Sequence, residues 1–176
     1  YKELSRGGQT FILYNKTASI ENYASHIRKL VPDAKVTYAH GQMEKNVLDN
    51  IMNDFINHEY DVLICTTIIE SGIDIPNVNT LLVHEAENFG LSQLYQIRGR
   101  VGRSDRIAYA YLFQEKHKVL SDIAMKRLKA IKEFTELGSG YKIAMRDLSL
   151  RGAGDIFGAS QAGFVDSVGI NLYMKM

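Results

Sequence analysis

The stretch DVLICT, residues 61–66, is an almost entirely apolar run that begins and ends with a polar residue. Such a run is typical of a strand that is buried on both faces of a parallel sheet. Similar runs follow as NTLLVH at 79–84 and AYAYLF at 108–113, and two precede it as QTFILY at 9–14 and KVTYAH at 35–40. The sequence therefore predicts a sheet of buried, parallel strands.

Helical patterns lie between these runs. Residues 20–30 and 47–56 carry apolar side chains at the three- and four-residue spacing of an amphipathic helix. We expect Ser19 to cap the first of these helices, which should end before Pro32. Strands that alternate with helices of this length predict crossover connections and a three-layer α/β architecture.

The alternation stops after residue 114. Residues 121–137 form a strongly amphipathic segment that predicts one helix, and the glycines of residues 138–140 should end it. A glycine-rich tail follows. We therefore expect two parts, a sheet domain over residues 1–118 and an appended helical hairpin and loop over residues 119–176.

The composition is that of an ordinary globular protein, with 45% hydrophobic and 23% charged residues and a net charge of +1. Cys65 is the single cysteine, so the chain can build neither an internal disulfide nor a cysteine-based metal site. No stretch approaches the ~20 apolar residues that cross a bilayer. We expect a cytoplasmic protein and, because the chain begins with Tyr1, a fragment of a longer one.

Polar residues follow the 61–66 run in the segment TTIIESGIDIP. Ligands of open α/β sheets bind at the carboxyl ends of strands, which is where Thr66, Thr67, Gly72 and Asp74 are expected. The alternative is a plain loop in which these side chains satisfy local backbone groups.

The segment QIRGRVGRSDR, residues 96–106, has four arginines and two glycines. If it is helical, Arg100 and Arg103 share one face and Arg98 points nearly the opposite way. Each interior glycine costs a helix ~1 kcal/mol relative to alanine, which is reasonable where a ligand must approach the backbone. Planar guanidinium groups match phosphate oxygens, so the pattern indicates a phosphate site. The alternative is a solvated basic face with a helix end at Gly102.

These segments resemble the motifs of superfamily 2 helicases and translocases. Residues 66–76 resemble motif V, residues 96–103 motif VI, and FILYN at 11–15 motif IV, in the order and at the separation of the family's second RecA-like domain. The resemblance implies a RecA-like sheet and ATP-driven movement on nucleic acid.

Within that superfamily the chain is similar to the RecG and transcription-repair coupling factor families. FGLSQL at 89–94 precedes motif VI in both, and DLSLRGAGDIFG at 147–158 resembles their translocation motif. The Arg-Gly-Ala-Gly order and the ending GINLYM at 169–174 favour the coupling factors. This implies a double-stranded DNA translocase that removes stalled RNA polymerase and couples transcription to nucleotide excision repair. It also implies RNA polymerase and UvrA as partners, bound by regions outside this chain.

The resemblance also implies roles for single residues. Arg100 and Arg103 match arginine fingers, which complete an ATP site held mainly by the first RecA-like domain of the same protein. Gly72, Asp74 and Gln96 match positions that contact the nucleotide.

Two further groups match positions that act on DNA. Thr66 and Thr67 match residues that touch a DNA phosphate, and Arg127, Arg151 and Gln161 match the translocation motif. The resemblance implies that this motif pushes on duplex DNA as the ATP cleft opens and closes.

The sequence contains no GxxxxGK[ST] loop and no acidic box after a strand. The resemblance therefore implies that ATP and Mg²⁺ are held by the first domain, with no metal ligands in this chain, and that the chain alone does not hydrolyse ATP. One alternative function is a RecG-like, fork-remodelling helicase. Another is a non-catalytic module that binds nucleic acid or a phosphate ligand and reuses the fold.

Overall fold

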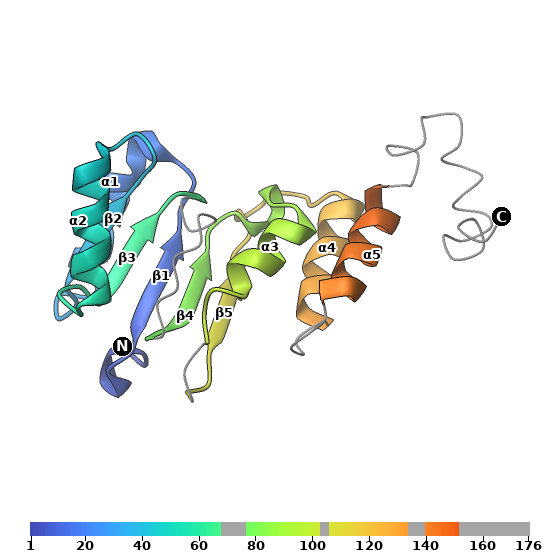
Figure 1. Cartoon of the computed structure of the whole chain (residues 1–176). Coiled ribbons are helices and arrows are strands. Elements are labelled where there is room, and N and C mark those ends of the chain that lie inside the picture. Colours follow the sequence, from blue (N-terminus) through green and yellow to red (C-terminus); the bar gives the residue numbers. More distant parts are fainter. Residues whose placement is uncertain (68–76, 103–105, 134–139, 152–176) are drawn as a thin grey trace. The chain divides into compact units, whose positions relative to one another are not determined.

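The computed structural model describes residues 1–67, 77–102, 106–133 and 140–151 (Figure 1). The chain divides into two compact units. The first unit joins Tyr1–Ala86 with Gln96–His117, and the second joins Glu87–Tyr95 with Lys118–Met176.

A five-stranded sheet forms the centre of the first unit (Figure 1). Its strands are β1 (Gln9–Leu13), β2 (Val36–Ala39), β3 (Val62–Cys65), β4 (Val78–Val83) and β5 (Tyr109–Leu112). They lie in the order β2-β3-β1-β4-β5, and every neighbouring pair is parallel. The predicted parallel α/β sheet is confirmed.

Two helices, α1 (Ile20–Leu30) and α2 (Lys45–Ile56), cover opposite faces of this sheet. Successive side chains of a strand point to opposite faces. Ile12 of β1 belongs to one apolar cluster with Ile20 of α1. Its neighbour Phe11 meets Phe55 of α2, with ring centroids 5.4 Å apart. The order helix, sheet, helix is the three-layer architecture expected from the sequence.

Burial along the strands follows their place in the sheet. All four residues of β3 are buried, because β3 lies between β2 and β1 and has a helix on each face. β5 was expected to be buried on both faces, and that expectation is wrong. It is an edge strand in which Tyr111 is 45% exposed.

The start of α1 also differs from the prediction. Ser19 is the residue before the helix, but its side chain makes no capping hydrogen bond. Its hydroxyl lies 2.9 Å from the Tyr14 hydroxyl and donates to the Lys16 carbonyl. A 3₁₀ turn, Thr17–Ser19, leads directly into α1, so the Ile20 N–H already has the Thr17 carbonyl as its acceptor.

The second unit contains a pair of packed helices, α4 (Asp122–Glu133) and α5 (Gly140–Arg151). Ala124, Ala130 and Ile131 are the buried residues of α4. Ile123 is 46% exposed, whereas Ala130 is 2% exposed. The short helix α3 (Leu91–Arg98) supplies residues to both units.

None of the helices in the described ranges is both long enough and apolar enough to cross a membrane.

Cys65 provides a test of the packing around β3. Its side chain is 2% exposed, and burial raises the pKa of its thiol. Because the thiolate is the reactive form, iodoacetamide in mildly alkaline buffer should leave Cys65 unmodified in the folded chain and alkylate it rapidly in concentrated guanidinium chloride. Mass spectrometry of the Cys65 peptide measures both rates. Equal rates in the two buffers would contradict the buried position.

Candidate nucleotide and DNA interface

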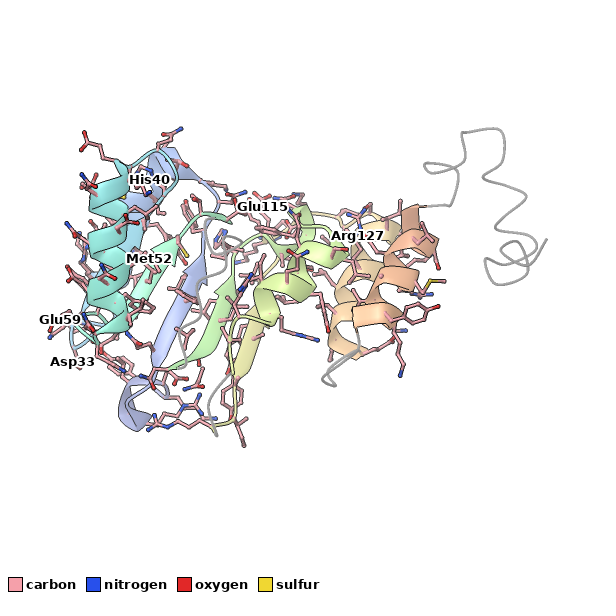
Figure 2. All side chains as sticks on the ribbon, viewed as in Figure 1. Asp33, His40, Met52, Glu59, Glu115 and Arg127 are labelled. Carbon is pink, nitrogen blue, oxygen red and sulfur yellow. The ribbon has the colours of Figure 1, made fainter. Side chains whose placement is uncertain are left out.

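The carboxyl ends of the parallel strands lie along one edge of the sheet, where ligands of open α/β sheets bind. The residues that directly follow β1, β2, β3 and β4 are Tyr14, His40, Thr66 and His84. Figure 2 labels His40 at this edge. The structure thus brings Thr66 to the predicted ligand edge.

The two threonines of the motif V segment differ in exposure. Thr66 is 7% exposed, and its N–H donates to the Ala39 carbonyl at 3.3 Å. Thr67 is partly exposed. Thr67 is therefore the more accessible of the two for a DNA phosphate. Gly72 and Asp74 lie outside the described residues.

An aromatic cluster at the same edge was missed by the sequence analysis. The rings of Tyr14 and Tyr23 stack with centroids 4.2 Å apart, and His84 meets Tyr14 edge-on at 5.2 Å. Burial raises the pKa of the Tyr23 hydroxyl. The pairing of β1 with β4 brings His84, which is 70 residues away in the sequence, next to Tyr14, so no local sequence pattern could have found this contact.

An ion pair lies close to this cluster in the sequence. Lys16, two residues after Tyr14, donates to Glu85, and this hydrogen bond raises the pKa of the lysine. Glu85 has a positive φ of 52°, an uncommon backbone conformation for a residue with a side chain. The edge therefore carries a paired cation and anion beside its aromatic rings.

The arginine-rich segment does not continue the helix. α3 ends at Arg98, and the N–H groups of Arg100 and Val101 donate to carbonyls three residues earlier, in a turn. Gly102 then takes a positive φ of 77°, and its N–H donates to the Val78 carbonyl at 3.1 Å. This hydrogen bond ties the turn to the first residue of β4.

α3 ends before Arg100, so the helical spacing assumed for the two arginines does not hold at Arg100. The shared face of Arg100 and Arg103 stays a prediction. Arg103 lies outside the described residues. Arg100 is partly exposed in the turn, Gln96 is exposed on the last turn of α3, and Ile97 beside it is 2% exposed. The buried Ile97 fixes the end of the helix that presents Gln96 and precedes Arg100.

Arg127 lies on α4, as Figure 2 shows, and is partly buried. Its Nε is fully buried and has no hydrogen-bond partner among the described residues. A buried N–H without a partner is costly, so this position is unusual for a purely structural side chain. Arg151 is the last residue of α5, and Gln161 lies outside the described residues.

The described residues at this site suit a phosphate group better than a metal ion. Arg100 offers a planar guanidinium at a glycine-containing turn, which matches phosphate oxygens. Within the described ranges, no group of three or more His, Cys, Asp or Glu side chains could hold a metal. Arg100 therefore suits a phosphate group, whereas the described ranges offer no metal site.

A pocket of about 260 Å³ lies elsewhere in the first unit. Residues of the amino-terminal turn, α1 and four strands line it, among them Tyr1, Ile27, Leu82 and Tyr109. None of the candidate site residues is in its lining, so it is not part of the predicted interface.

Gly102 offers a test of the turn that carries Arg100. An alanine there would hold a positive φ and bring its Cβ to 2.6 Å from the Ala108 Cβ. We expect Gly102→Ala to lower the free energy of unfolding by about 1–2 kcal/mol or more. Gly41→Ala is the matched control, because a Cβ at Gly41 meets nothing within 4 Å. Urea unfolding with equal midpoints for both variants would contradict the described turn.

Comparison with known proteins places these features in a family. Residues 1–105 match the helicase conserved C-terminal domain. The chain is 62% identical over 175 residues to the transcription-repair-coupling factor of Bacillus subtilis, and 60% identical to that of Staphylococcus epidermidis. Each match covers 99% of this chain and 15% of the relative, so the chain spans about a seventh of the length of these relatives.

Solved structures agree. The structure of RecG bound to a three-way DNA junction matches with a TM-score of 0.72 and 37% identity, over 88% of this chain and 20% of that one. The C-terminal domain of the DEAD-box protein Dbp5 shares the fold at a TM-score of 0.55 and 23% identity, over 76% of this chain and 75% of that one. The sheet topology, the turn with Arg100 and the family match lead to one conclusion: the chain belongs to the helicase conserved C-terminal domain family.

Proposed function

We propose that the chain is the second RecA-like domain and translocation motif of an ATP-dependent, double-stranded DNA translocase of the transcription-repair-coupling factor type. The observation that carries this proposal is the turn after α3, which presents Arg100 at a glycine-containing backbone. The 62% identity to the Bacillus factor over nearly the whole chain supports the choice of this type.

In this proposal the chain supplies half of an ATPase site. Phosphoryl transfer depends mostly on positioning and on stabilising charge at the transferred phosphate. The guanidinium groups of Arg100 and Arg103 provide that positive charge from across a cleft, and Gln96 positions the nucleotide. The first RecA-like domain binds ATP and Mg²⁺. Hydrolysis then requires closure of the two domains and is thereby coupled to their movement.

The remaining site residues serve nucleotide and DNA. Gly72 lets the backbone approach the ligand, and Asp74 reaches the ribose or the interdomain contact. Thr66 or Thr67 touches a DNA phosphate. The translocation motif then acts on the duplex through Arg127, Arg151 and Gln161.

The wider role follows from the same family. The complete protein removes stalled RNA polymerase in the bacterial cytoplasm and leads to nucleotide excision repair, with RNA polymerase and UvrA bound by other regions. A RecG-like, fork-remodelling helicase is the second candidate, favoured by the 37% identity and TM-score of 0.72 to RecG. Displacement of stalled polymerase by the full-length protein, compared with regression of a model fork, separates the two.

Arginine substitutions in the full-length protein test the proposal. Arg100→Ala and Arg103→Ala should each lower DNA-stimulated ATP turnover by roughly a thousand-fold, the usual effect of losing an arginine finger, and leave DNA affinity unchanged. Arg106→Ala is the control, since Arg106 is in the same basic segment and donates to the Arg6 carbonyl. A passive nucleic-acid binding module would instead lose DNA affinity, which would overturn the proposal.

A further inference from the structure

Glu3 is a buried carboxylate in the amino-terminal turn to which no role has yet been given. It is 7% exposed and directly precedes the 3₁₀ turn η1 (Leu4–Arg6). A buried carboxylate is costly unless it is paired and accepts hydrogen bonds. Glu3 meets both conditions, because the Thr80 hydroxyl of β4 donates to its Oε2 and the Arg6 side chain donates to both of its oxygens. The carboxylate therefore ties the amino-terminal turn to β4.

The Arg6 side chain is oriented by this pair. Its Nε lies 3.0 Å from Glu3 Oε1 and its Nη2 lies 2.5 Å from Glu3 Oε2, so the contact is bidentate. A guanidinium group is planar, so two held nitrogens also set the direction of the third. That third nitrogen, Nη1, donates to the Ile107 carbonyl at 2.8 Å, and the guanidinium carbon lies 5.2 Å from the centroid of the Tyr109 ring. Glu3 thus directs Arg6 toward the segment that enters β5.

The Ile107 segment packs against the turn that presents Arg100. Ala108, the next residue, is so close to Gly102 that a Cβ built on Gly102 would lie 2.6 Å from the Ala108 Cβ. The Gly102 N–H also donates to the Val78 carbonyl of β4 at 3.1 Å. All of these residues belong to the first unit. The turn is therefore held both by β4 and by the segment that enters β5.

We propose that Arg6 is a positioning residue for the turn that presents Arg100, and that Glu3 orients it. This inference rests on the proposed function, in which Arg100 stabilises charge on the transferred phosphate. An arginine in that role must be placed accurately, because a small displacement from the reacting group costs a large part of the rate. Loss of the Arg6 fork releases Ile107 and, with it, one of the two supports of the turn.

Arg106 makes a separate contact with the amino-terminal turn. Its guanidinium donates to the backbone carbonyl of Arg6, so this bond does not involve the Arg6 side chain. The Arg6 guanidinium should keep its bonds to Glu3 and Ile107 when Arg106 is altered. Arg106→Ala should therefore leave the turn of Arg100 in place.

Substitutions in the full-length protein test this inference by single-turnover ATP hydrolysis on duplex DNA, a measurement that still resolves slow variants. Arg6→Lys keeps the positive charge beside Glu3, but a lysine has no planar fork with which to reach Ile107 as well. It should lower the rate by about ten-fold, less than Arg100→Ala does, because Arg100 is present but is placed less accurately. Glu3→Gln leaves Arg6 without its charged acceptor and should lower the rate in the same direction. Affinities for ATP and DNA should stay within about two-fold, because Arg6 is not proposed to contact either ligand.

The double variant Arg6→Lys/Arg100→Ala separates a positioning role from an independent one. If Arg6 acts through Arg100, the double variant should hydrolyse ATP no more slowly than Arg100→Ala alone. Arg28→Lys is the matched control, because Arg28 is another arginine that donates to a backbone carbonyl, that of Val36, at 3.1 and 2.9 Å. It lies on α1 and contacts β2, the edge strand opposite β5, and should hydrolyse ATP at the unaltered rate.

Four results decide the matter. An unaltered rate in both Arg6→Lys and Glu3→Gln overturns the inference. A further loss of similar size in the double variant also overturns it, because Arg6 would then act independently of Arg100. A parallel loss of thermal stability and DNA affinity in Arg6→Lys overturns it as well, since the residue would be only structural. If Arg100→Ala itself hydrolyses ATP at the unaltered rate, the proposed function has failed, whatever the Arg6 variants do.

Discussion

Parallel pairing of β3 with β1 and β2 is the constraint on which the rest of the structure depends. A parallel strand in the middle of a sheet needs a crossover connection at each end and an apolar cover on each face. α1 and α2 provide this cover, and Ile12 and Phe11 direct their side chains to one helix each. The same pairing gathers the carboxyl ends of the strands at one edge, where Thr66 and the aromatic cluster of Tyr14, Tyr23 and His84 are found.

The turn after α3 contributes Arg100 to the candidate site. If α3 had continued beyond Arg98, the position of Arg100 would have been set by the helix alone. The positive φ of Gly102 and its hydrogen bond to Val78 instead tie the segment to the start of β4. The position of Arg100 therefore depends on the sheet as well as on α3.

The sequence predicted the strands and helices that have a regular apolar period. It did not predict features that depend on a single contact between two residues. Apolar runs identified the five strands, and apolar side chains at helical spacing identified α1, α2 and α4. These patterns are visible because the buried faces of strands and helices must be apolar. The cap by Ser19 was wrong: its side chain makes no capping hydrogen bond, and a 3₁₀ turn leads directly into α1. The shared face of Arg100 and Arg103 was predicted from a continuous helix, whereas α3 ends at Arg98; it stays a prediction because Arg103 lies outside the described residues. The hydrogen bond from Ser92 to Asp147 joins residues 55 positions apart, which no local pattern reveals.

In the proposed function, this chain holds the arginine half of an ATP site and depends on another domain for the rest. ATP turnover by the purified 176-residue chain, compared with the full-length protein in the presence of duplex DNA, tests it most directly. We expect background hydrolysis by the chain alone and DNA-stimulated hydrolysis by the full-length protein. DNA-stimulated turnover by the isolated chain would contradict it.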